Sequence, residues 1–209
     1  MILIGQYDSP FVRRVAIAMT LYSTTFEHRP WSTFGDGDLI EPFNPLRRVP
    51  TLVIGDSSVL IDSVYILDWL DEQAGEAALI ARSGPERQQA LYYIALTTGF
   101  SDKCVAMFYE KVLHTETSAI WMERLETQIG ATLGRLEVIR AQAATPWLFG
   151  DRIGHADIAL GCAIRHAHDA HKDAIDWSAR PALLAHSAAC EGLDVFQAIF
   201  QPFKGPGES

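Results

Sequence analysis

Two short segments place groups with chemical potential at the start of a predicted helix and of a predicted strand. Ser9 precedes Pro10, an order typical of the first residues of a helix. A hydroxyl at the positively polarised end of a helix can donate a hydrogen bond to an anion. Pro50 interrupts the segment Val49–Ile54, which otherwise predicts a strand, so we expect it at an edge, a strand start or a tight bend.

A third segment, Asp62-Ser63, follows the next predicted strand and is expected to begin a helix with Ser63 as its N-cap. A helix N-terminus with a hydroxyl binds a carboxylate, and a neighbouring carboxylate can receive an ammonium group. A cis Val49–Pro50 bond would leave the Val49 backbone directed at an extended peptide ligand. Together the three segments favour a site for a small peptide that carries a thiol.

Composition limits the class of protein. The chain has 209 residues, 48% of them hydrophobic, which suffices for one large or two small packed cores. A formal net charge of −9 argues against nucleic acid or an anionic membrane as the main partner. No apolar run approaches the ~20 residues of a membrane span, and residues 1–5 lack the pattern of a signal peptide. Three widely spaced cysteines imply no disulfide framework, so we expect a cytoplasmic protein.

The order of the predicted elements indicates a thioredoxin-like α/β domain over residues 1–76. Strand, helix and strand are followed by a hairpin around Gly55-Asp56 and by a further helix. The strands are expected at 1–6, 25–31, 49–54 and 58–61, and the helices begin at 10 and, after the Ser63 cap, at 64.

The remainder of the chain predicts an all-helical domain over residues 84–209, after a linker at 74–82. Ser83 and Glu86 offer a capping box for its first helix. An apolar stripe at helical spacing follows, and the uniformly apolar run 158–164 predicts a helix through the centre of this domain. The stripe consists of Trp121, Leu125, Ile129, Leu133 and Leu136.

Four segments in this order resemble the cytosolic glutathione transferase superfamily, and the resemblance covers nearly the whole chain. Residues 9–14 look like the start of the first helix in its serine-type classes, and residues 44–52 like its cis-proline segment. Asp62-Ser63 looks like its acidic-serine pair, and residues 150–157 like the capping segment of its core helix.

The resemblance implies a glutathione co-substrate and a role for each matching residue. Ser9 would donate to the glutathione sulfur and favour the thiolate, and Phe11 would belong to the same binding segment. Val49 and Pro50 would pair with the cysteinyl backbone. Asp62 and Ser63 would hold the γ-glutamyl group, and Arg48 or Arg47 would meet the glycine carboxylate.

Two other side chains are alternatives for the thiol chemistry. Tyr7 is an alternative donor, because other classes of the superfamily use a tyrosine at the end of the first strand. Ser9 matches the serine-type pattern better by position, so we expect Tyr7 to be a wall of the second-substrate pocket or simply an aromatic residue at the strand end. No cysteine stands at positions 9 or 12, which argues against thiol–disulfide exchange. Cys104 could approach the site, although a lone cysteine on a helix is usually a small core residue.

The second substrate is expected in a cleft between the two domains, and the resemblance implies a homodimer. We predict conjugation of the glutathione thiolate to a small apolar electrophile. A glutathione-dependent isomerase or dehalogenase, and a non-catalytic binding or regulatory protein, remain alternatives. The pocket walls are expected from Tyr7, Trp31, Phe34, Phe100, Cys104, Met107 and Phe108, with Tyr109 as a further candidate.

Three histidines near residue 170 raise the question of a metal site. His168 and His171 are spaced to share a helical face, whereas His166 would point elsewhere, and the spacing matches no zinc motif. We therefore predict no metal and a polar helix end.

Gly154 stands where the resembled family usually has serine or threonine, so the capping box there lacks a hydroxyl. Asp157 can still accept from the Gly154 N–H, and glycine is an acceptable N-cap. Gly154→Ser should therefore raise the free energy of unfolding by only about 0.3 kcal/mol. Thermal denaturation measures this, and a melting temperature raised by more than several degrees would contradict it.

Overall fold

The computed structural model describes residues 1–55, 58–171 and 173–205, and the chain divides into two compact units. The first contains Met1–Arg82 together with the chain from Leu193 onward, and the second contains Ser83–Gly192. The predicted division assigned everything from 84 to 209 to the helical domain. The last segment belongs instead to the first unit, where the Arg13 side chain of the N-terminal helix donates hydrogen bonds to the carbonyl oxygens of Phe196 and Ile199.

The first unit is built on a mixed sheet with the strand order β2-β1-β3-β4 among the described residues. β1 is parallel to β2 and antiparallel to β3, and β3 is antiparallel to β4. This confirms the predicted thioredoxin-like arrangement, although the predicted hairpin residue Asp56 lies outside the described residues. The elements are β1 (Ile2–Ile4), α1 (Pro10–Leu21), β2 (Glu27–Arg29), α2 (Gly37–Ile40), β3 (Thr51–Ile54), β4 (Ser58–Ile61), α3 (Ser63–Ala74), a 3₁₀ turn (Gly75–Ala77) and α8 (Asp194–Ala198).

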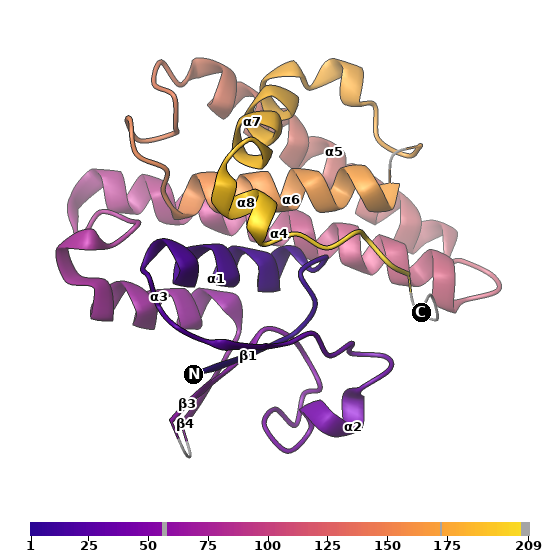
Figure 1. The fold of residues 1–209 in the computed structure, drawn as a ribbon. Helices are drawn as coiled ribbons and strands as arrows, with labels where there is room; N and C mark the ends of the chain where they lie inside the picture. The colour runs from indigo at the N-terminus through magenta and orange to yellow at the C-terminus, as the bar shows by residue number, and fades with distance from the viewer. Residues whose placement is uncertain (56–57, 172, 206–209) are drawn as a thin grey trace. The chain divides into compact units, whose positions relative to one another are not determined.

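Alternation along the strands gives the sheet two apolar faces. α1 and α3 lie on one side of the sheet (Figure 1). Leu3 and Leu52 are cross-strand partners with no exposed surface. On the opposite face Ile4 and Val53 pack with Ile40 of α2. Both faces are therefore buried, and the strand ends remain as the places where the unit can present polar groups.

Gly5 follows β1 and allows the chain there to pass close to Val12 of α1 and to Val49. Its φ of +131° lies in the region that favours glycine. A Cβ at this position would lie 2.5 Å from Val12 Cγ2 and 2.8 Å from Val49 Cβ. These contacts are closer than packing permits, so glycine is required for this approach.

The second unit is helical and consists of α4 (Gly84–Leu113), α5 (Ala119–Gln142), α6 (His155–His171), a 3₁₀ turn (Trp177–Ala179) and α7 (Pro181–Glu191). α6 packs against both α4 and α7, and α5 packs against α4 and α7. Residues 158–164 of α6 are buried throughout, which confirms the predicted central helix. The predicted stripe on α5 is buried from Leu125 onward, whereas Trp121 is 37% exposed.

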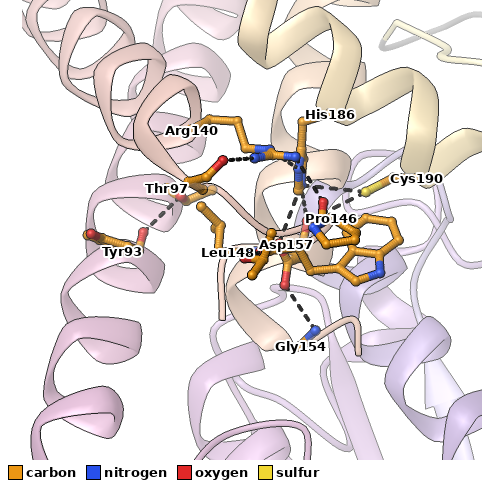
Figure 2. Close-up of polar contacts among 12 residues, drawn as sticks. Tyr93, Thr97, Arg140, Pro146, Leu148, Gly154, Asp157, His186 and Cys190 are labelled. Atoms are coloured by element: carbon orange, nitrogen blue, oxygen red, sulfur yellow. Dashed lines mark hydrogen bonds and ion pairs between the residues drawn. The ribbon is translucent and has the colours of Figure 1, made fainter. Parts of the chain in front are cut away.

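A buried polar network closes the N-terminal end of α6 (Figure 2). The Asp157 carboxylate accepts from Gly154 N at 3.0 Å, which confirms the predicted bond, and also from Leu148 N at 2.8 Å. The Arg140 Nε donates to His186 Nδ1 at 3.1 Å, and His186 Nε2 donates to the Asp157 carbonyl at 3.2 Å. Burial lowers the pKa of His186 to about 4, so the imidazole is neutral and the network is structural at neutral pH.

Two predicted helix starts differ from the structure in detail. Ser83 is the N-cap of α4 as predicted, but its side chain makes no capping hydrogen bond, so the predicted capping box was wrong. α3 is capped by Asp62, whose carboxylate accepts from Val64 N at 2.9 Å, and Ser63 is the first helical residue. Both aspartate and serine are good caps, and the backbone path into α3 favours the residue one position earlier.

Gly5→Ala should lower the free energy of unfolding by about 3 kcal/mol, because it adds both backbone strain and overpacking. Gly99→Ala on α4 is the control, since a Cβ there meets nothing within 4 Å. That change should leave stability unchanged or raise it by roughly 0.5–1 kcal/mol. Chemical denaturation of both variants tests this, and a Gly5→Ala variant as stable as the parent would contradict the described approach.

Candidate functional site

The sheet register brings the three predicted segments to one edge. Ile4 pairs with Thr51, and Thr51 pairs with Ile61. The chain leaving β1 toward Ser9, the chain entering β3 through Pro50 and the chain leaving β4 toward Ser63 therefore lie side by side. Adjacent strands are about 4.8 Å apart, so the row spans roughly 10 Å.

Ser9 is the N-cap of α1, and its Oγ accepts from Val12 N at 3.4 Å. This distance is long for a hydrogen bond, so the cap is weak. A hydroxyl that accepts one bond still has its own O–H to donate. The capping role and the proposed role toward an anion are therefore compatible.

Tyr7 is held by a stacking contact with β2. Its ring is parallel to that of His28 within 2°, with centroids 3.8 Å apart. The His28 Nε2 lies 2.8 Å from the Gly5 carbonyl oxygen, which fixes the imidazole in turn. Burial raises the pKa of Tyr7, so the phenol is protonated at neutral pH.

The Val49–Pro50 peptide is cis, and β3 begins directly after it at Thr51. Asn44, for which the sequence analysis predicted no individual role, holds this segment in place, and the residue is only 1% exposed. Its Nδ2 donates to the Arg48 carbonyl at 2.9 Å and to Thr51 Oγ1 at 3.1 Å, and its Oδ1 accepts from Leu46 N at 3.0 Å. The signal was an asparagine directly before Pro45, where its side chain commonly bonds the backbone two residues on.

Ser63 and Asp62 differ in their surroundings. Asp62 is exposed, and one carboxylate oxygen accepts from Val64 N. Ser63 is 2% exposed, and its Oγ has no hydrogen-bond partner within the described part of the chain. A buried hydroxyl without a partner is costly, so this group is ready to bond a ligand that reaches it.

The two arginines before Val49 are not equivalent. Arg47 adopts a φ of +50° and its side chain pairs with Asp38 at 2.9 Å and with Glu41 at 2.7 Å. Arg48 is exposed and makes no ion pair with any residue in the ranges 1–55, 58–171 and 173–205. Arg48 is therefore the one of the pair that remains available for an anion.

Three predicted pocket residues lie instead in the core of the helical unit. Phe100, Cys104 and Met107 are at most 2% exposed and belong to one buried cluster. Burial raises the pKa of Cys104 to about 12, so it is a neutral thiol. Side chains without exposed surface cannot contact a ligand, and these three are withdrawn as pocket walls.

The other predicted aromatic residues keep exposed surface. Phe34 is 50% exposed, and Trp31 is partly buried, with the Arg29 guanidinium 5.2 Å from its ring. In the helical unit Phe108 is partly buried, with its ring 6.3 Å from that of His171. Phe11 on α1 is also partly exposed.

The three histidines are engaged in different places. His171 is buried, and its Nε2 lies 2.8 Å from the Cys104 carbonyl oxygen. His168 is half exposed beside Trp177, and His166 is 8% exposed. Among the described residues no group of three or more His, Cys, Asp or Glu is arranged to hold a metal ion. The described residues also contain no helix long and apolar enough to cross a membrane.

Comparison with protein-family models gives one family for both parts of the chain. The glutathione S-transferase N-terminal domain matches residues 3–78, and the glutathione S-transferase C-terminal domain matches residues 119–189. Glutathione S-transferase U17 of Arabidopsis thaliana is 30% identical over 164 residues, which cover 77% of this chain and 70% of that protein.

Solved structures of similar proteins cover almost the whole chain. A glutathione S-transferase from Methylobacterium radiotolerans, in complex with glutathione sulfonate, is 25% identical with a TM-score of 0.89, over 98% of this chain and 96% of that one. A bacterial maleyl pyruvate isomerase, described as a zeta-class glutathione S-transferase, is 25% identical with a TM-score of 0.82 and full coverage of both chains.

The native protein should have no rapidly reactive thiol, because Cys104, Cys162 and Cys190 are all buried. Ellman's reagent should release well under one equivalent within minutes at neutral pH. In guanidinium chloride it should release three, one for each cysteine. A full equivalent released rapidly from the native protein would contradict the described burial and reopen cysteine chemistry.

Proposed function

The chain belongs to the glutathione S-transferase family, and we propose that it binds glutathione along the sheet edge described above and transfers the thiolate to a small apolar electrophile. The observation that supports this proposal is the register of Ile4, Thr51 and Ile61, which brings the three candidate binding segments into one row. The row is about as long as an extended tripeptide, since one residue spans roughly 3.3 Å.

In the proposed mechanism Ser9 lowers the pKa of the glutathione thiol. A free thiol has a pKa of about 8.5 and is only a few per cent ionised at neutral pH. The Ser9 O–H donates to the sulfur, and the N-terminus of the twelve-residue helix α1 adds a favourable potential. The thiol proton passes to solvent, so the serine stays protonated and neither attacks the substrate nor accepts a proton.

The peptide backbone of glutathione is proposed to pair with Val49. The cis peptide joins Val49 to Pro50, and β3 begins at Thr51, so Val49 lies outside the ladder of β3. Val49 thus keeps backbone groups for an added antiparallel segment. The Asn44 bonds hold the preceding turn in place, which reduces the entropy that binding must overcome.

The γ-glutamyl end is proposed to bind at the N-terminus of α3. Helix geometry leaves the first N–H groups without intrahelical partners, and they suit a carboxylate. Asp62 has a second carboxylate oxygen for the α-ammonium, beside the one that caps Val64. The Ser63 Oγ is closed to solvent, so we expect its side chain to rotate toward the carboxylate on binding.

At the other end Arg48 is proposed to meet the glycine carboxylate, because Arg47 is already paired with Asp38 and Glu41. Of the predicted apolar walls, Tyr7, Trp31 and Phe34 of the first unit keep exposed surface and remain candidates for contacts with the second substrate, and Phe108 of the helical unit stays a prediction from the sequence. Conjugation then proceeds by attack of the thiolate on the electrophilic carbon. The leaving group departs with the electron pair, or water protonates the adduct. The homodimer and the cytoplasmic location stay predictions.

A glutathione-dependent isomerase is the second candidate function. It is favoured by the full-length likeness to the zeta-class maleyl pyruvate isomerase. On the same site the thiolate would add to an unsaturated substrate and leave after bond rotation, so glutathione is regenerated. A panel of haloarenes and cis-unsaturated diacids separates the two, because only conjugation consumes glutathione.

Ser9→Ala should leave glutathione bound and remove most of its thiolate at neutral pH. The matched control is Ser118→Ala, because Ser118 caps α5 with the same geometry, its Oγ accepting from Trp121 N at 3.4 Å. Each variant should lose about 1 kcal/mol of stability. Only Ser9→Ala should lower the bound thiolate fraction, by roughly tenfold or more for a charge-assisted bond.

Calorimetric titration of glutathione and the ultraviolet thiolate band measure binding and ionisation separately. If wild type binds glutathione and Ser9→Ala keeps its thiolate, Tyr7 or another donor activates the sulfur and the proposed role of Ser9 is wrong. If wild type shows neither binding heat nor thiolate, the chain is a non-catalytic member of the family, and Ser9 serves only as a helix cap.

A further inference from the structure

The segment Ile199–Lys204, here called the C-terminal strap, contacts the turn that carries Ser9. The Gln201 Oε1 accepts from Tyr7 N at 3.1 Å. The Lys204 N donates to Asp8 Oδ2 at 3.2 Å. These bonds join residues 194 and 196 positions apart in sequence, so nothing local to the N-terminal region predicts them.

The start of the strap is fixed to α1 by a buried arginine. Arg13 is 4% exposed, and its Nε donates to the Ile199 carbonyl at 2.8 Å. Its Nη2 donates to the Phe196 carbonyl at 2.8 Å, and its guanidinium lies 5.3 Å from the Phe196 ring centroid. Because Arg13 lies one helical turn after Ser9, the strap is anchored to the same helix whose first turn it reaches.

The turn needs such support, because β1 ends at Ile4. Gly5 N still bonds the Arg29 carbonyl at 2.9 Å, and Ser9 N bonds the Gln6 carbonyl at 3.2 Å. Tyr7 N lies between these two bonds, and its partner is the strap's Gln201. A partly buried N–H without a partner is costly, so the turn depends on this side chain to keep its conformation.

We propose that Gln201 is a positioning residue for the proposed thiol-activating hydroxyl. By fixing Tyr7 N, it holds the turn that sets the direction of the Ser9 O–H. The backbone N–H of Lys204 in the strap also holds Asp8, the residue between Tyr7 and Ser9, by donating to its carboxylate. The positioning role of Gln201 rests on the proposed function of Ser9. The hydrogen bond by which Gln201 holds the turn does not depend on any ligand.

The test compares Gln201→Leu with Gln201→Glu, which keeps an acceptor oxygen at the same place. Gln142→Leu is the control, because Gln142 is exposed at the end of α5 in the other unit. NMR measures amide exchange at Tyr7 in the ligand-free full-length proteins. Gln201→Leu should speed that exchange by about fivefold, the worth of one neutral hydrogen bond. Gln201→Glu and Gln142→Leu should leave it within about twofold.

The second readout is the thiolate fraction of bound glutathione near neutral pH. Gln201→Leu should lower it by roughly threefold or more, while the affinity for S-methylglutathione, which has no thiol, stays within about twofold. A merely structural role would lower the melting temperature of the variant and leave the thiolate fraction of the folded complex unchanged.

The outcomes separate the two proposals. Unchanged exchange at Tyr7 in Gln201→Leu overturns the positioning role, whatever glutathione does. Faster exchange with an unchanged thiolate fraction overturns it as well, and leaves the proposed function of Ser9 standing. If wild type binds no glutathione, the proposed function fails and so does the catalytic part of this inference. Faster exchange in Gln201→Leu would then show that the strap serves only the fold.

Discussion

Strand pairing in the N-terminal sheet is the constraint on which the candidate site depends. Because Ile4, Thr51 and Ile61 are fixed as neighbours across β1, β3 and β4, the chain segments beyond them must meet at one edge. A one-residue slip would turn the apolar residues of a strand to the opposite face. The buried Leu3–Leu52 pair therefore sets the positions of polar groups it never touches. The same strand register therefore determines both how the core packs and where the candidate site residues lie.

Around this row the molecule uses side chains from distant segments to hold short turns. Asn44 secures the turn before Pro50, and Gly5 lets the end of β1 approach Val49. Arg13 and Gln201 tie the C-terminal strap to α1 and to the turn before it. The proposed ligand-binding groups thus stand on turns that are held from outside their own sequence neighbourhood, as preorganised recognition requires.

Local chemistry explains what the sequence could predict. The order Ser9-Pro10 marks a helix start whatever surrounds it, and the interrupted strand at Pro50 allowed only a few placements. The cap on α1 and the Asp157 bond to Gly154 N were accordingly predicted correctly. The cis bond agrees with the cis-proline segment that residues 44–52 resemble.

The predictions from sequence that were wrong concern features that depend on tertiary structure. Asp62 and Ser63 are both good caps, and only the path of the chain selects Asp62. Phe100 and Cys104 have the spacing of either a pocket wall or a core, and tertiary packing buries them. The return of the C-terminal segment to the first unit depends on hydrogen bonds from Arg13 that no periodicity reveals.

A crystal structure of the full chain with glutathione tests the central claim most directly. The account predicts an extended tripeptide along the sheet edge, its backbone paired with Val49 and its γ-glutamyl group at the N-terminus of α3. The sulfur should lie within hydrogen-bond distance of Ser9 Oγ. Glutathione bound elsewhere, or bound in the row with its sulfur on another donor and Ser9 Oγ facing only Val12 N, would contradict it.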